Sequence, residues 1–134
     1  PTGPLHLGNA RGAVIGDCLA RIFKLCGIKT TSEYYVNDRG TQIETLGRSV
    51  LAILGKIPQE ENFYKGEYLN EIILNLESEI LELNDAQTIG KNTADIILND
   101  YIKPSLKNFG VKFDNYFLET DLYKGNLNKK VLNF

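Results

Sequence analysis

Residues 1–12 read PTGPLHLGNARG, and they combine a turn rich in glycine and proline, the chain's single histidine and the start of a helical pattern. Gly3 and Gly8 allow backbone conformations that a side chain forbids, and they leave room for a ligand beside the main chain. Asn9 is a good capping residue for the helix that follows, whose unpaired N–H groups suit a polyphosphate. His6 is placed to donate to a phosphate oxygen during transfer. The stretch therefore predicts a phosphate-binding turn, although the same residues also fit a plain turn before a helix.

A helix and a strand follow this turn in the sequence. Apolar residues at helical spacing predict an amphipathic helix over residues 10–26, which Gly27 ends. Residues 28–37 are rich in threonine, tyrosine and other strand-forming residues, and we expect a strand there. Turn, helix and strand in this order indicate half of a parallel α/β unit.

Polar side chains alternate along the expected strand. The alternation places Glu33, Tyr35 and Asn37 on one face, near the carboxyl end of the strand. Open α/β sheets bind their ligands at that end, so these residues are candidates for a site. A half-exposed strand with ordinary polar residues fits the same pattern.

The middle of the chain is expected to be helical. Amphipathic stripes predict helices over three segments, residues 40–55, 68–83 and 93–109. Residues 84–90 break the pattern, and Pro104 should kink or split the last helix. A short aromatic strand is expected over residues 111–118. The helices therefore look like an insertion between two strands of a sheet, at about residues 56–110. The acids of residues 67–82 predict a solvated face, because no histidine or cysteine accompanies them.

Composition limits the classes of protein that fit. The net charge is −2 and no basic block is present, which gives no sign of non-specific nucleic-acid binding. Cys18 and Cys26 lie about 12 Å apart along the predicted helix, too far for a disulfide, so we expect buried thiols in a reducing cytosol. No apolar run approaches the ~20 residues of a membrane span. Methionine is absent, and residues 126–134 begin a helical pattern without a cap, so we expect an internal fragment of a longer protein.

Three stretches together resemble a known family. PTGPLHLGNARG with Gly16-Asp17, EYYVNDRGTQI at residues 33–43 and FGVKFDNYFLETDLY at residues 109–123 are similar to the catalytic domain of bacterial arginyl-tRNA synthetases. Within the first stretch, His6-Leu7-Gly8-Asn9 resembles the His-Ile-Gly-His signature of class I aminoacyl-tRNA synthetases. Asn9 stands where the second histidine of that signature usually is.

The resemblance implies an α/β fold, an incomplete Rossmann-like parallel sheet with a helical insertion. Residues 1–134 would be part of the catalytic domain, with the N-terminal and anticodon-binding domains missing. The signature's partner, a Lys-Met-Ser-Lys-like loop, is absent, so the fragment alone should be a poor catalyst. The resemblance also implies a cytoplasmic and monomeric parent protein with no membrane partner.

The implied reaction is the ATP-dependent ligation of arginine to its tRNA through an arginyl-adenylate. The partners would be tRNA, L-arginine and ATP as its magnesium complex, with no bound metal or organic cofactor. His6 and Asn9 would be catalytic, and Glu33, Asn37 and Asp38 would accept the arginine guanidinium beside Tyr35; alternatively, Asp38 caps the helix after Gly40. The residues expected to bind ATP are Pro1, Thr2, Gly3, Pro4, Leu5, His6, Leu7, Gly8 and Asn9.

Two other functions remain open from the sequence. The first is another nucleotidyltransferase of the same superfamily, acting on a different substrate. The second is a non-catalytic paralogue or interaction module. EYYVNDRGTQI would have to be coincidental under the first alternative, and the retained His6 and Gly8 argue against the second.

Overall fold

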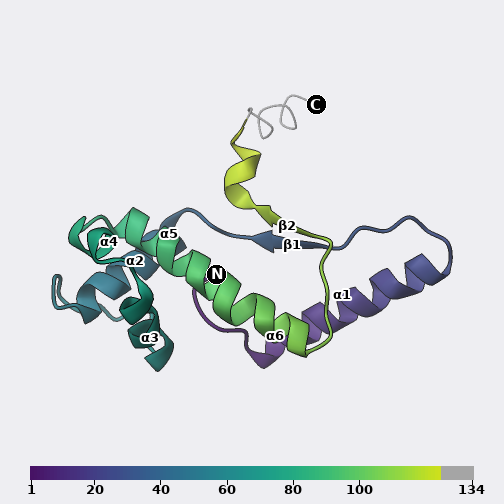
Figure 1. Cartoon of the computed structure of the whole chain (residues 1–134), viewed down its shortest axis with the longest axis horizontal. Helices are drawn as coiled ribbons and strands as arrows, with labels where there is room; N and C mark the ends of the chain where they lie inside the picture. The colour runs from purple at the N-terminus through teal and green to yellow at the C-terminus, as the bar shows by residue number, and fades with distance from the viewer. Residues whose placement is uncertain (125–134) are drawn as a thin grey trace. The chain divides into compact units, whose positions relative to one another are not determined.

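The computed structural model describes residues 1–124, which form two compact units (Figure 1). The helical unit contains residues 1–4 and 38–102, and the α/β unit contains residues 5–37 and the described residues from Lys103 to Lys124. The helix expected to begin at Asn126 lies outside the described residues. Within residues 1–124, no helix combines the length and apolarity needed to cross a membrane.

The α/β unit opens with α1, Leu7–Leu25, which begins three residues before the predicted start at Ala10. His6 is its N-cap residue, and Asn9, predicted to cap this helix, contributes to the capping with its side chain from the third helical position. The prediction that Gly27 ends this helix is confirmed. Gly27 has a φ of 75°, and the N–H of Ile28 donates to the carbonyl of Phe23 at 2.9 Å, as in the common glycine-terminated helix end.

The side chains of α1 are more exposed than the sequence pattern suggests. Five apolar residues of the predicted stripe are 41–55% exposed: Val14, Ile15, Leu19, Ile22 and Phe23. Cys18 and Cys26 are free and also exposed, so the prediction of buried thiols is wrong for the described part of the chain. The reason is physical: periodicity shows which face of a helix is apolar, but not whether another element covers it.

Two short strands form a parallel sheet. Strand β1, Glu33–Val36, pairs with β2, Asn115–Leu118, in a register that aligns Glu33 with Asn115 (Figure 1). The predicted α/β class and parallel pairing are confirmed, but both strands are shorter than expected. Before the first paired residues, the carbonyl of Ser32 accepts from the backbone N–H of Asn115 at 3.1 Å, and the backbone N–H and hydroxyl of Ser32 donate to the side chain of Asp114.

Asp114 ties three segments of the α/β unit together. Its Oδ2 accepts hydrogen bonds from the backbone N–H of Ser32 at 2.9 Å, from the Ser32 hydroxyl at 2.9 Å and from the Lys24 ammonium at 3.1 Å. The bonds from the backbone and hydroxyl of Ser32, followed by the bond from Lys24, lower the pKa of Asp114 to about 2. The ionised carboxylate therefore joins the end of α1 to the segments that precede β1 and β2.

Asp114→Asn is expected to lower the thermal stability of the protein at neutral pH, because the ionised acceptor of three hydrogen bonds is lost. A lowered pKa in the folded state stabilises the protein above the ordinary aspartate pKa, and this contribution disappears as the pH falls through about 2. The difference in melting temperature between the wild type and the variant should therefore shrink from pH 4 to pH 2. A difference that stays constant across that range would contradict the assignment.

The helical unit contains four α-helices and the π-helical turn η1. Their bounds are α2, Thr41–Ile53; α3, Glu67–Asn75; α4, Ser78–Glu82; α5, Ala86–Ile96; and η1, Ile97–Ile102. The core lies where α2 packs on α5, and its fully buried apolar side chains include Ile43, Leu46, Leu69, Ile72, Ile89 and Ile97. The prediction for residues 40–55 is confirmed, and Gly55 follows the helix with a φ of 71°.

Two boundaries in this unit differ from the predictions. The helix expected over residues 68–83 is divided into α3 and α4, because Leu76 and Glu77 have extended ψ angles of 138° and 135°. The break expected over residues 84–90 is shorter, because the Asp85 side chain caps α5 by accepting from the N–H of Thr88 at 3.0 Å. The lowered pKa of Asp85 has the same cause, namely the hydrogen bonds from Thr88. The acids of residues 67–82 are exposed, as predicted.

The helical geometry changes just before Pro104, as predicted. Helix α5 continues into η1 and then, in the α/β unit, into α6, Lys103–Asn108. Proline lacks an N–H, and its ring crowds the carbonyl four residues earlier, so a wider helical turn at this point relieves the conflict. A 3₁₀ turn, η2, Glu119–Leu122, follows β2.

Candidate functional site

A pocket of about 380 Å³ lies within the α/β unit. It is formed by the first turns of α1, by β1, and by two apolar residues from α6 and the segment before β2. The residues that line it are Leu5, Gly8, Asn9, Gly12, Ala13, Glu33, Tyr34, Tyr35, Leu106 and Phe113. The pocket thus brings residues of the predicted phosphate-binding turn together with Glu33 and Tyr35 of the predicted strand face.

His6 and Asn9 form a reciprocal pair at the start of α1. The Nδ1 of His6 accepts a hydrogen bond from the backbone N–H of Asn9 at 3.4 Å, and the Oδ1 of Asn9 accepts from the backbone N–H of His6 at 3.1 Å. This is a capping box in which histidine replaces the usual serine or threonine. Because Nδ1 accepts, the neutral ring carries its proton on Nε2, and that N–H remains as a donor.

Gly8 makes this geometry possible. A Cβ on Gly8 would meet the Cε1 and Nδ1 atoms of the His6 ring at 3.1 Å, tighter than ordinary contacts allow. Glycine at position 8 therefore leaves room both for the His6 ring and for the pocket that Gly8 lines. His6 itself is exposed and does not line the pocket.

The predicted ATP-binding stretch is divided between the units. Pro1–Pro4 belong to the helical unit, and Leu5–Asn9 belong to the α/β unit. Within the helical unit, the Tyr68 hydroxyl donates to the carbonyl of Thr2 at 2.9 Å. The sequence contains no signal for this contact, because Tyr68 lies 66 residues away from Thr2 in a segment without a motif.

Glu33 and Tyr35 lie on the exposed face of β1, as predicted from the alternation. The Glu33 Oε2 accepts from the Asn115 side-chain amide at 2.8 Å, and the Tyr35 ring stacks on Phe117 with centroids 6.3 Å apart. One carboxylate is thus held in place beside a flat aromatic surface. Such a pair suits a planar cation such as a guanidinium.

The pocket also contains aromatic residues that the sequence analysis did not select. Tyr34 and Phe113 line it, and their rings meet edge to face with centroids 5.3 Å apart. Burial, and next the neighbouring Tyr116, raise the pKa of Tyr34, so its hydroxyl stays protonated at neutral pH. The alternation of side chains places Tyr34 on the face of the strand opposite Glu33 and Tyr35. It gives no reason to expect that this face forms a wall of a pocket.

Two predicted arginine-binding residues lie elsewhere. Asn37 follows β1 and does not line the pocket, and Asp38 belongs to the helical unit. The N-cap position of α2 is Gly40, with a φ of 81°, and not Asp38. A positive φ favours glycine, which explains why it occupies that position.

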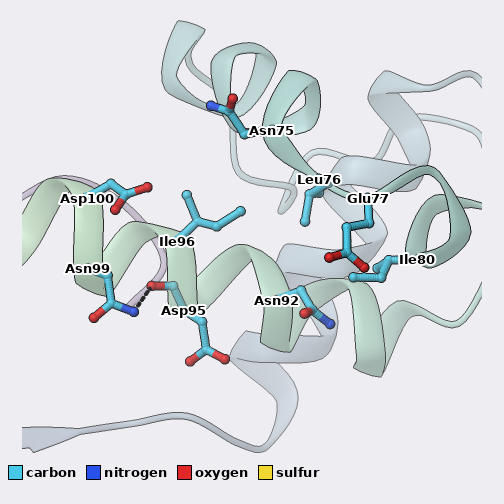
Figure 2. A pocket seen from close by; sticks show the side chains of 9 residues that line it. All are labelled: Asn75, Leu76, Glu77, Ile80, Asn92, Asp95, Ile96, Asn99 and Asp100. Atoms are coloured by element: carbon cyan, nitrogen blue, oxygen red, sulfur yellow. Dashed lines mark hydrogen bonds between the residues drawn. The ribbon is translucent and has the colours of Figure 1, made fainter.

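A second pocket, of about 250 Å³, lies in the helical unit and has a different character (Figure 2). Three carboxylates and three amides line it with three apolar residues: Glu77, Asp95, Asp100, Asn75, Asn92, Asn99, Leu76, Ile80 and Ile96. Figure 2 shows that the three carboxylates lie apart from one another. An acidic lining repels a polyphosphate, so this pocket does not compete with the first as a nucleotide site. Within residues 1–124, no group of three or more His, Cys, Asp or Glu residues could hold a metal ion.

Comparisons with known proteins show what the chain is similar to. The chain is 46% identical over 133 residues to the arginine–tRNA ligase of Wolbachia pipientis wMel, with 92% of this chain and 23% of the relative covered. It is 43% identical over 147 residues to that of Aliarcobacter butzleri, with 98% and 27% covered. A crystal structure assigned as an arginyl-tRNA synthetase from Campylobacter jejuni matches with a TM-score of 0.79 and 35% identity, covering 98% of this chain and 31% of that chain. No protein-family profile matches the chain.

These matches show that the chain is similar to a segment of tRNA ligases. Within that class it is homologous to a segment of the arginine–tRNA ligases, which confirms the resemblance recognised in the sequence. The chain spans about a quarter of the length of the curated relatives it matches.

Proposed function

We propose that the protein containing this chain ligates arginine to its tRNA. The arginine carboxylate attacks the α-phosphate of ATP, pyrophosphate leaves and an arginyl-adenylate forms. The arginyl group then passes to the terminal ribose of the tRNA, and AMP is released. The observation that carries the proposal is the pocket of the α/β unit, in which Gly8 and Asn9 at the start of α1 meet Glu33 and Tyr35 of β1.

The ATP would lie at the start of α1, with Pro1–Asn9 along its path. Gly8 leaves the backbone accessible, and the first N–H groups of a helix attract a phosphate. The Nε2–H of His6 suits the negative charge that grows on the α-phosphate during attack. Asn9 contributes in two ways, through the wall of the pocket and through the hydrogen bonds that orient His6. ATP enters as its magnesium complex, and no other cofactor is proposed.

The guanidinium of arginine would bind to Glu33 against the ring of Tyr35. Glu33 lines the pocket and is oriented by Asn115, so one carboxylate oxygen is already fixed for a hydrogen bond. Asn37 and Asp38 remain proposed acceptors that act together with residues elsewhere in the protein. A guanidinium offers five donors, which is more than Glu33 alone can accept.

Glu33→Gln is expected to raise the KM for arginine by about 10- to 100-fold, because a hydrogen bond to a charged group is lost. The amide is similar in size and still accepts from Asn115, so the β1–β2 pairing should persist. The measurement is the initial rate of arginine charging at varied arginine concentration. The KM for ATP should change little. An unchanged KM for arginine would remove Glu33 from the proposed pocket.

The fold of the larger protein follows from the same proposal. We infer that β1 and β2 belong to an incomplete Rossmann-like parallel sheet of a class I synthetase catalytic domain, with the helical insertion at about residues 56–110. The N-terminal and anticodon-binding domains would lie outside this chain. The protein would act in the cytoplasm as a monomer without a membrane partner. The high identity over most of this chain supports these inferences.

The decisive experiment is aminoacylation by the full-length protein. It should charge its tRNA with radiolabelled arginine and leave lysine, the other long basic amino acid, uncharged. Pyrophosphate exchange with ATP is measured in parallel with tRNA present, because activation in this family generally waits for tRNA. Exchange with a different amino acid would indicate another nucleotidyltransferase, and no binding of ATP in a titration would indicate a non-catalytic module.

A further inference from the structure

Tyr68 makes a precise contact with the backbone of the predicted ATP-binding stretch, inside the helical unit. Its hydroxyl donates to the carbonyl of Thr2 at 2.9 Å. It also lies so close to Gly3 that a Cβ there would meet the hydroxyl oxygen at 3.4 Å. Residues 1–4 lie in no helix or strand, and two of them are prolines. A side-chain hydrogen bond is therefore a strong constraint on their path.

The position of the Tyr68 ring is itself closely determined. Tyr68 is in the first turn of α3, and the next residue, Leu69, is fully buried, as is Ile72 one turn later. Gly66, with a φ of 148°, lies under the ring, and a Cβ there would come within 2.8 Å of two ring carbons. Both the backbone conformation and the close approach require glycine at position 66. The hydroxyl is thus presented to Thr2 from a rigid support.

We propose that Tyr68 is a positioning residue for ATP, which holds the Thr2–Gly3 turn in the conformation that the nucleotide requires. This inference rests on the proposed function, because it takes residues 1–9 as the path of ATP. It gives the helical insertion a direct part in nucleotide binding. The stretch passes from the helical unit to the α/β unit between Pro4 and Leu5, so its first half depends on α3 for its shape.

The charge state of Tyr68 is consistent with a permanent donor. Burial, and next the neighbouring Tyr64, raise its pKa above the ordinary tyrosine value of 10.0, so the phenol keeps its proton at every pH at which the enzyme would work. The contact should therefore be independent of pH between about 6 and 9.

The test compares Tyr68→Phe with the wild type in the full-length protein, using tRNA charging at varied ATP and arginine. Tyr68→Phe keeps the ring and removes only the hydrogen bond, which is worth about 3- to 10-fold in affinity. The KM for ATP should rise by that factor, whereas kcat and the KM for arginine should change less than about 2-fold, as expected when ground-state binding is lost. Tyr68→Leu, which also removes the ring, should raise the KM for ATP further.

Tyr64→Phe is the matched control. Tyr64 is a half-buried tyrosine of the same unit, and its backbone N–H donates to the Ser49 hydroxyl at 2.9 Å. Its loss of a hydroxyl should leave the KM for ATP unchanged. The melting temperature of Tyr68→Phe should match that of the wild type.

Two results would overturn the inference. One is a wild-type KM for ATP in Tyr68→Phe, and the other is an equal rise in the KM for both ATP and arginine. Failure of the proposed function would look different, because the wild-type protein itself would not charge tRNA with arginine. In that case the affinity of the wild type and Tyr68→Phe for ATP, measured by calorimetric titration, still tests whether Tyr68 positions the nucleotide.

Discussion

His6→Ala in the full-length protein is expected to slow amino-acid activation by about 100- to 1000-fold, the usual effect of removing one donor to a transition-state oxyanion. The structure identifies the donor atom. Nδ1 of His6 accepts from the backbone N–H of Asn9, so Nε2 carries the proton. Alanine removes that N–H from the α-phosphate while the pocket walls remain. The rate is measured by pyrophosphate exchange with tRNA present.

The same substitution also removes a helix cap, and a second variant separates the two effects. His6 is the N-cap of α1, so alanine should cost about 1 kcal/mol of stability. Asparagine is a favoured N-cap residue with a side-chain acceptor, so His6→Asn should retain most of the stability and still lack the imidazole donor. A loss of rate in both variants supports the role in catalysis. Wild-type activity in His6→Asn would mean that His6 serves only to start α1.

The capping box explains why the helix start was misplaced from the sequence. Asparagine is common as an N-cap and histidine is not, so propensity favoured Asn9 over His6. The reciprocal hydrogen bonds between the two residues reverse that preference, because Asn9 acts as the third helical residue of a capping box. Only pairwise geometry decides this, and a residue-by-residue preference does not contain it.

The strand face was predictable and the walls of the pocket were not. Alternation alone places Glu33 and Tyr35 on one side of β1, and both line the pocket. Phe113 and Leu106 come from segments more than 70 residues later in the chain, and no local pattern links them to β1. Their approach depends on the parallel pairing with β2, which is a tertiary interaction.

The break predicted over residues 84–90 includes Gly90, and a tertiary contact again explains why the structure differs there. In the structure Gly90 lies inside α5 and is buried against α2, where Gly47 is its counterpart. A Cβ on Gly47 would lie 2.8 Å from the backbone nitrogen of Gly90, and one on Gly90 would lie 3.1 Å from that of Gly47. The two helices can cross so closely only because neither residue has a side chain.

Gly47→Ala is therefore expected to destabilise the helical unit by about 3 kcal/mol, at the upper end of the usual cost of overpacking. The added methyl group would overlap the carbonyl of Ala86, a backbone group that cannot rotate away, and α2 and α5 would have to separate. That separation opens the core around Ile43 and Ile89, which are fully buried. Hydrogen exchange of the α2 and α5 amides in the full-length protein measures the effect locally, as faster exchange in both helices.

Gly16→Ala is the matched control, because Gly16 is also inside a helix but a Cβ there would meet no atom within 4 Å. Alanine should stabilise α1 by about 0.5 to 1 kcal/mol through its higher helix propensity. Gly90→Ala should resemble Gly47→Ala, since its methyl group would overlap the carbonyl of Ile43. Because one separation of the helices accommodates both methyl groups, the double variant should cost clearly less than the sum of the single variants. Strictly additive effects, or wild-type exchange in Gly47→Ala, would mean that the two glycines do not hold α2 and α5 in contact.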